Sequence, residues 1–251
     1  NFSKHINGKM YSYAYHIGGD IMVLNGGKDS VSVNQINSDS LVNVFKYMFE
    51  GVGITTVVSS LLYYTGAVAF FPNNRIFSIM LFAVQIILTI AMGNALTKNT
   101  SVEAMKTMFF TYSCTMGVNM TSIAAAYNVG QIAAAFAISA IYFACLAVIG
   151  KSTKIDLTKI GHLCLACLGV LVVSQLLFLI FKVPINVRIL SIFGILIFTG
   201  ITAWDIQRMH RQMSFFSDEK YAIYFALQLY LDFINIFIYI LQLVVKQSSD
   251  N

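Results

Sequence analysis

The chain has 251 residues, of which 57% are hydrophobic and only 11% are charged, and its formal net charge is +5. Soluble domains carry roughly 25% charged residues, so this composition excludes an ordinary soluble protein and indicates a polytopic membrane protein. In such a protein a positive net charge reflects cytoplasmic loops rich in lysine and arginine. We therefore expect the lipid bilayer, and no nucleic acid, as a partner.

The first forty residues differ in composition from the rest. They are rich in Asn, Ser and Gly, as in VLNGGKDSVSVNQINSDS, and they lack the apolar core of a signal peptide. We expect residues 1–40 to form a disordered, flexible polar N-terminal tail. One membrane domain is expected over residues 41–246, followed by a short C-terminal tail over residues 247–251.

The membrane domain contains seven apolar segments separated by turn-forming sequences such as FPNNR, TKNTS and YNVG. A helix needs about 20 mostly apolar residues to cross a bilayer, and each segment meets that length. The sequence therefore predicts an all-α fold, a bundle of seven transmembrane helices. The expected helices cover residues 42–70, 76–96, 105–127, 130–150, 158–181, 185–208 and 220–245, with Pro184 just before the sixth.

Lysines and arginines divide unequally between the two sides of this predicted bundle, and the side with more of them is normally cytoplasmic. The N-terminus is therefore expected to be cytoplasmic. The richer side holds Lys4, Lys9, Lys28, Lys46, Lys98, Lys106, Lys151, Lys154, Lys159, Arg208, Arg211 and Lys220, and the other holds Arg75, Lys182, Arg188 and Lys246.

Asp232 lies inside the seventh segment, LQLYLDFINIFIYILQLVV, eleven residues after Tyr221. At about 1.5 Å per residue it would lie roughly 16 Å deep, near the middle of a hydrocarbon core about 30 Å thick. A carboxylate there costs about 2.5–3.5 kcal/mol on insertion scales, so it needs a partner, water or a proton.

Polar residues recur on the same face of that helix at spacings of four, three, four and three. This pattern predicts either a hydrated, ion-conducting face turned inward or polar contacts that hold helices together. The aspartate in the middle favours the ion-conducting interpretation. The residues are Gln228, Asp232, Asn235, Tyr239 and Gln242.

Asp205 ends the sixth segment in FTGITAWDIQRMH, with Thr202 one turn before it. By itself it could be a surface aspartate paired with Arg208. The short connection to the seventh segment predicts antiparallel packing, which could bring Asp205 close to Asp232. Neighbouring carboxylates cannot both ionise cheaply, so such a pair would share a proton and act as a proton switch. Asp205 looks shallower, so the two meet only if the sixth helix starts deep or the seventh extends into the cytosol.

Three stretches carry a resemblance to a known family. FTGITAWDIQRM, LQLYLDFINIFIYILQLV and KIDLTKIGHLCLACLGVLV resemble the Bax inhibitor-1-like proteins, also called the transmembrane Bax inhibitor motif family. The resemblance covers residues 41–246 in layout, and LYLDFIN is typical of bacterial members. It implies a seven-helix fold, a bacterial inner-membrane location and a role in the stress response, with other membrane proteins as partners.

The resemblance also implies a function, a pH-sensitive calcium leak channel and not an enzyme. Asp205 and Asp232 would be the pH-sensing pair and would bind the permeant calcium ion transiently, with no resident cofactor. Some bacterial relatives have an arginine at the end of the second helix that latches onto the first aspartate. Here that region reads IAMGNALTKN, so Lys98 is the latch candidate.

Three other functions remain open from the sequence. Intramembrane aspartyl proteases also place one aspartate on each of two neighbouring helices, but their Gly-x-Gly-Asp and Pro-Ala-Leu motifs do not occur here. A proton-coupled transporter should show internal repeats and broken helices, and neither is clear. The third alternative is an interaction protein of the membrane stress response.

Overall fold

The computed structural model describes residues 13–17, 20–24, 33–67, 75–98, 100–181, 186–213 and 218–246. Before the first helix it contains two short strands, β1 (Tyr13–Ile17) and β2 (Asp20–Leu24), paired antiparallel with Tyr13 opposite Leu24. The prediction of a disordered, flexible polar tail over residues 1–40 is therefore not confirmed for these strands. The first helix also begins within that range, at Val33.

Seven helices follow, in the order that the sequence predicts. The first helix starts earlier and the sixth ends later than predicted, because a helix can continue beyond the apolar segment that crosses a membrane, whereas the first helix ends at Tyr64, before its predicted end at residue 70. The helices are α1 (Val33–Tyr64), α2 (Arg75–Thr97), α3 (Val102–Ala126), α4 (Val129–Ser152), α5 (Thr158–Phe181), α6 (Val187–Met213) and α7 (Glu219–Lys246).

Local signals explain several helix ends. Asn128 caps α4 by accepting from the backbone N–H of Gln131, whose side chain in turn accepts from the N–H of Asn128. Asn186 accepts from the backbone N–H groups of Arg188 and Ile189 at the start of α6. Gly66, with φ of 72°, follows the last turn of α1 in the left-handed conformation typical of helix stops. Pro184 lies outside the described residues.

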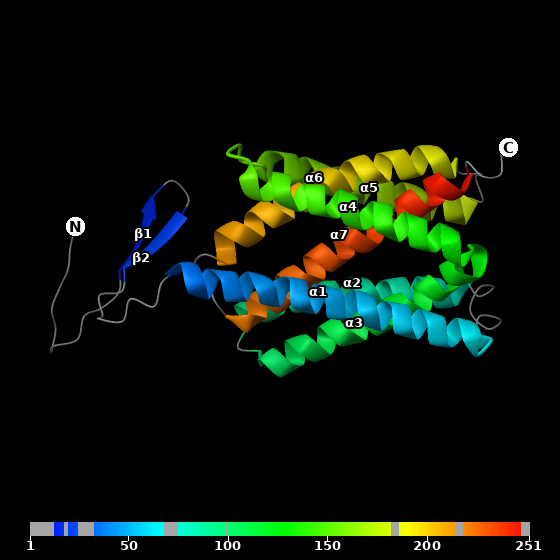
Figure 1. Cartoon of the computed structure of the whole chain (residues 1–251), viewed down its shortest axis with the longest axis horizontal. Helices are drawn as coiled ribbons and strands as arrows, with labels where there is room; N and C mark the ends of the chain where they lie inside the picture. The colour runs from blue at the N-terminus through cyan, green and yellow to red at the C-terminus, as the bar shows by residue number, and fades with distance from the viewer. Residues whose placement is uncertain are drawn as a thin grey trace.

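The helices form two groups of three with α7 between them (Figure 1). α1 and α2 pack against α3 in one group, and α4 and α5 pack against α6 in the other. α7 contacts helices of both groups. It is accordingly the most completely buried helix, with Leu227, Leu229, Tyr230 and Ile236 fully enclosed.

Six of the helices are long and apolar enough to cross a membrane, within the described part of the chain. α3 is the exception among the predicted seven. It includes Glu103 and Lys106 near its start and many hydroxyl-bearing residues along its length, which lower its hydropathy. The seven-helix bundle is thus confirmed as a set of helices, whereas length and composition support six spans.

Close contacts at glycines bring α6 against its neighbours. A Cβ atom added to Gly150 of α4 would lie 2.6 Å from the Ala203 carbonyl oxygen of α6. One added to Gly194 of α6 would lie 2.5 Å from the ring of Tyr239 on α7. Small residues at such crossings let two helix backbones approach each other closely. α6 is therefore held at a defined position between α4 and α7.

Candidate functional site: a buried acid pair between α6 and α7

The antiparallel packing of α6 and α7 brings the two predicted aspartates together. Asp205 is 2% exposed and Asp232 is 3% exposed, and the charge of Asp205 acts on Asp232. Both helices continue past the pair, because α6 runs to Met213 and α7 starts at Glu219. The predicted end of α6 at residue 208 was too early, and the later end reduces the difference in depth that the prediction implied.

Several buried polar atoms of the acid pair have no hydrogen-bond partner in the described part of the chain, although one of them, Asp205 Oδ1, is ion-paired with Arg208. Among the described residues, four buried side-chain atoms have no hydrogen-bond partner, and all four belong to this site. Buried polar atoms in native proteins are nearly always hydrogen-bonded, so a cluster of exceptions indicates a functional site. The atoms are Thr202 Oγ1, Asp205 Oδ1, Arg208 Nε and Asp232 Oδ2.

Arg208 supplies the positive charge of the site. Its Nη2 lies 2.8 Å from Oδ1 of Asp205, one turn earlier on α6, as an ion pair without hydrogen-bond geometry. Its guanidinium carbon lies 4.6 Å from the ring centroid of Trp204 and 5.5 Å from that of Phe225. A planar guanidinium stacks well on aromatic rings, which fixes its position while its side chain stays 25% exposed.

The site therefore combines two carboxyl groups with one guanidinium. Arg208 acts on the charges of both Asp205 and Asp232, and Thr202 lies beside Asp232. One guanidinium can balance one carboxylate, so the second carboxylate has no opposite charge of its own. A buried, uncompensated carboxylate is costly, and a proton or a cation would remove that cost.

Gln207, which the sequence did not single out, attaches the α4–α5 loop to α6 beside the acid pair. Its Nε2 donates to the Ile155 carbonyl oxygen at 2.8 Å, and its Oε1 accepts from the Leu157 N–H at 2.9 Å. Arg211, one turn further on, forms an ion pair of 3.1 Å with Asp156 in the same loop. A glutamine near the end of a helix is common in proteins, so the sequence could not predict that Gln207 contacts the α4–α5 loop.

The polar face of α7 lies along α6. Ser191 of α6 donates to Oε1 of Gln242 at 2.8 Å, and Tyr239 packs on Phe198 with ring centroids 6.1 Å apart. Asn235 donates to the Leu231 carbonyl oxygen of its own helix at 2.8 Å. Gln228 is half-buried one turn before Asp232. The contact through Gln242 joins two helices, which is the alternative role predicted for this face.

Lys98, the latch candidate, lies exposed just after α2. In the part of the chain that the structure describes, no ion pair joins it to Asp205, whose ion-pair partner is Arg208. The same described residues contain no group of three or more His, Cys, Asp or Glu side chains placed to hold a metal ion. The acid pair thus offers two carboxylates and the Thr202 hydroxyl to a cation.

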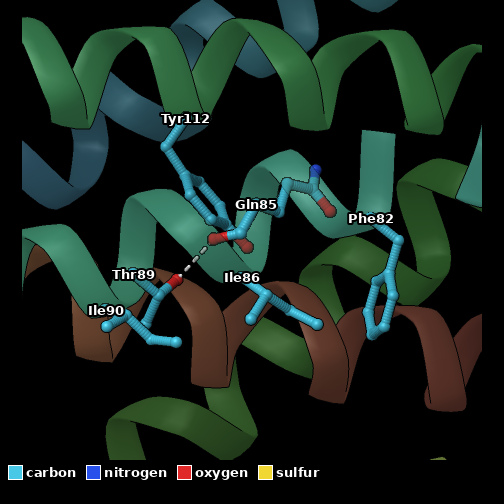
Figure 2. A pocket seen from close by; sticks show the side chains of 6 residues that line it. All are labelled: Phe82, Gln85, Ile86, Thr89, Ile90 and Tyr112. Atoms are coloured by element: carbon cyan, nitrogen blue, oxygen red, sulfur yellow. Dashed lines mark hydrogen bonds between the residues drawn. The ribbon is translucent and has the colours of Figure 1, made fainter. Parts of the chain in front are cut away.

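A separate small cavity lies at α2, away from the acid pair. It has a volume of about 180 Å³ and is lined mainly by α2 residues, together with Tyr112 of α3 (Figure 2). Thr89 donates to the Gln85 carbonyl oxygen at 2.9 Å, and the Gln85 amide contacts Met116 Sδ at 3.8 Å. No carboxyl group lines this cavity, so among the described residues it offers no counterpart of the acid pair.

These features define a class of protein, a multi-pass helical membrane protein with an acid pair buried beside its central helix. Residues 37–250 match the family model described as "Inhibitor of apoptosis-promoting Bax1". The chain therefore belongs to the Bax inhibitor-1-like family, as its sequence motifs indicated.

Curated bacterial proteins are similar to most of the chain. An uncharacterized protein of Borreliella burgdorferi is 34% identical over 185 residues, which are 72% of this chain and 79% of the relative. The inner membrane protein YbhL of Escherichia coli is 29% identical over 210 residues, 81% of this chain and 89% of the relative. An uncharacterized membrane protein of Streptococcus pyogenes is 28% identical over 222 residues, 86% of this chain and 94% of the relative.

Proposed function

We propose that this protein is a calcium leak channel whose opening is controlled by protons at the Asp205–Asp232 pair. The observation that carries this proposal is the burial of two carboxyl groups beside a single guanidinium, where Arg208 faces Asp205 and Asp232 Oδ2 has no hydrogen-bond partner among the described residues. A structural polar contact would satisfy its atoms, whereas a site that exchanges protons and cations must leave some of them available.

The charges of the site give a closed state at neutral pH. The ion pair between Arg208 and Asp205 holds the end of α6 in place. Asp232 lies across the helix interface, where the charges of Asp205 and Arg208 both act on it. Beyond Asp232, Tyr239 fits tightly against Gly194 and Phe198, which closes the α6–α7 interface. An ion that follows the polar face of α7 would have to separate the two helices there.

Acid is expected to open this arrangement. Added protons neutralise the carboxyl groups, and a neutral Asp205 no longer attracts Arg208 strongly. The attraction that keeps the end of α6 in place is then weakened. We therefore propose that the leak increases as the pH falls from about 8 to about 6, with the two carboxyl groups responding to added protons as one coupled pair.

Calcium suits the ligands that the site provides. Ca²⁺ binds carboxylate, carbonyl and hydroxyl oxygens in flexible geometry, and a tight site supplies six to eight such ligands. Asp205, Asp232 and Thr202 together supply fewer, so the ion would bind transiently and pass on, with no resident cofactor. A channel also needs no catalytic group, so we propose that the protein is not an enzyme.

The proposed topology has seven spans with a cytoplasmic N-terminus in a bacterial inner membrane. α3 would be the seventh span because it contacts α1, α2 and α7, and its buried polar residues, which include Ser113 and Thr121, are protected from lipid. The excess of lysine and arginine at the loop ends supports the orientation. YbhL of Escherichia coli, by its name an inner membrane protein, supports the location.

The test measures calcium entry into proteoliposomes that contain a calcium dye, from pH 6 to pH 8. The variants are Asp232→Asn and Asp205→Asn, because an amide keeps the shape of the carboxyl group but cannot carry its charge. The matched control is Glu103→Gln, which changes an exposed acid of α3 in the same way. We expect flux that rises at low pH in the wild type and in the control, and a flat profile in both aspartate variants.

Two results would contradict the proposal. Wild-type flux no greater than that of empty liposomes at every pH would exclude a channel. Flux with an unchanged pH profile in Asp232→Asn would exclude the acid pair as the sensor. In the first case a peptide-cleavage assay comes next, because an aspartyl protease also uses two aspartates on neighbouring helices. A proton-coupled transporter and a stress-response interaction protein would remain.

A further inference from the structure

A second cleft opens between α1, α4 and α6 at the predicted cytoplasmic end of the bundle. Its volume is about 640 Å³. Its apolar lining includes Phe45 and Phe49 of α1, Val148 of α4 and the buried Ile206 of α6. The cleft is thus apolar inside and open at the surface of the bundle.

The cleft lies where a bilayer would surround the protein. α1, α4 and α6 are all long and apolar enough to cross a membrane. Phe49 is 67% exposed and Val148 is 64% exposed, so both side chains would contact lipid tails. An apolar cleft at this position is accessible from the bilayer, and its natural occupants are amphiphiles with a tail in the membrane and a polar head near the surface.

Positive charge lies at the same cleft. Lys46 of α1 and Lys151 of α4 both line it, and His210 of α6 lies close enough to Lys151 to be affected by its charge. Phe49 is nearly one helical turn deeper than Lys46, and Val148 is likewise nearly one turn deeper than Lys151. Among the described residues, no acidic side chain lines the cleft. The two lysines could therefore hold an anionic head while the apolar residues below them contact the tail.

We propose that this cleft binds one anionic phospholipid from the cytoplasmic leaflet. The lysine ammonium groups would bind the phosphate, and an acyl chain would lie along Phe49 and Val148. A second copy of this chain is a poor occupant because a symmetric contact would place the lysines of the cleft against each other. A bound lipid would touch Ile206, the residue after Asp205 on α6. Lipid binding itself does not depend on the channel function proposed above.

The test is native mass spectrometry of the full chain released from detergent micelles. Phosphatidylglycerol and phosphatidylcholine with identical acyl chains are added in turn, and the bound copies are counted. The test variant is Lys46→Gln with Lys151→Gln. The matched control is Lys154→Gln with Lys159→Gln, which removes two exposed lysines near the same end of the bundle but outside the cleft.

We expect the wild type to bind one phosphatidylglycerol more tightly than phosphatidylcholine. Each lysine near an anionic lipid should contribute roughly fivefold, so the test variant should lose about 25-fold in affinity for phosphatidylglycerol. The control pair should keep it. Val148→Trp, which fills the cleft and keeps both lysines, should also weaken binding of this lipid.

Three results would overturn the proposal. Equal binding of the two lipids by the wild type would show that the cleft does not select an anionic head. Equal losses in the test and control variants would assign the selectivity to the net charge of the whole end. A dimer mass that disappears in Val148→Trp, with no selective lipid binding, would assign the cleft to a second copy of the chain.

Discussion

The buried polar groups on the two sides of α7 differ in whether they are hydrogen-bonded. On the side of α1 and α3, Thr55 donates to the Ser113 carbonyl oxygen at 3.0 Å, and the Tyr230 hydroxyl lies 2.6 Å from Thr55 Oγ1. On the side of α6, polar atoms of Thr202, Asp205 and Asp232 have no hydrogen-bond partner. Both sides are equally buried, so burial alone does not explain the difference.

This difference separates a structural polar cluster from a functional one. Tyr230 and Thr55 are neutral and satisfy each other, so their cluster stabilises the contact of α7 with α1 without a charge. The acid pair has charge, one guanidinium and unsatisfied atoms, so it stabilises the fold little and remains able to accept a proton or a cation. Substitutions on the side of α6 should therefore change calcium flux as well as stability, whereas substitutions on the side of α1 and α3 should change stability alone.

The largest expected effect on stability comes from Arg208→Gln. Removing one partner of a buried ion pair costs about 3–5 kcal/mol. Because the Arg208 side chain is 25% exposed, we expect about 2–3 kcal/mol, below that range for fully buried pairs. The loss would be read as the change in unfolding free energy in mixed micelles. The same variant should leak calcium at neutral pH, because nothing then holds Asp205.

A double-variant cycle isolates this ion pair. Asp205→Asn in the Arg208→Gln background should restore most of the lost stability, because no unpaired carboxylate remains. Arg208→Lys keeps the charge but not the planar stacking on Trp204, so its stability should be intermediate. Equal losses in Arg208→Gln and in the double variant would mean that Arg208 stabilises the fold by packing alone.

A smaller effect is expected on the other side of α7, from Tyr230→Phe. This change removes the hydroxyl that contacts Thr55 and leaves the aromatic contacts with Phe109 and Tyr112 in place. Loss of a buried hydrogen bond should lower the unfolding free energy by about 1–2 kcal/mol. The pH profile of calcium flux should not change. A flattened flux profile in Tyr230→Phe would contradict the claim that only the α6 side of α7 controls the pH response.

The sequence predicted the helices well because apolar segments and turn residues define them. α5 (Thr158–Phe181) has the predicted bounds, and α7 differs by one residue at each end. The early start of α1 and the late end of α6 were not predicted, because polar helical turns outside a bilayer lack the apolar pattern. The strands β1 and β2 were missed for a related reason, since their short segments lie within a stretch rich in Asn, Ser and Gly.

The candidate site was predicted in part. Asp205, Asp232 and Thr202 could be found because charged groups are rare in apolar segments. The position of Arg208 over Trp204 could not be found, because its neighbour Phe225 comes from α7 and sequence spacing on α6 says nothing of it. The contact of Gln207 with the α4–α5 loop depends in the same way on how distant segments pack.

The smallest effect is expected from Asp156→Asn, which changes an exposed aspartate–arginine pair instead of a buried one. The Asp156 side chain is 64% exposed, and hydrogen bonds from Thr158, together with Arg211, lower the pKa of its carboxyl group. A carboxyl group with a lowered pKa stabilises the fold above its unfolded pKa of about 3.9 and loses this contribution only as the pH falls through the folded value.

Between pH 6 and pH 8 the contribution of Asp156 is therefore constant. Asp156→Asn should leave the shape of the flux profile in that range unchanged, with at most a small shift of the melting temperature. The same flux measurements on Asp205→Asn show the effect of changing a buried aspartate for comparison. If Asp156→Asn flattens the flux profile as strongly as Asp205→Asn does, then pH sensing belongs to the attachment of the α4–α5 loop to α6 and not to the buried pair.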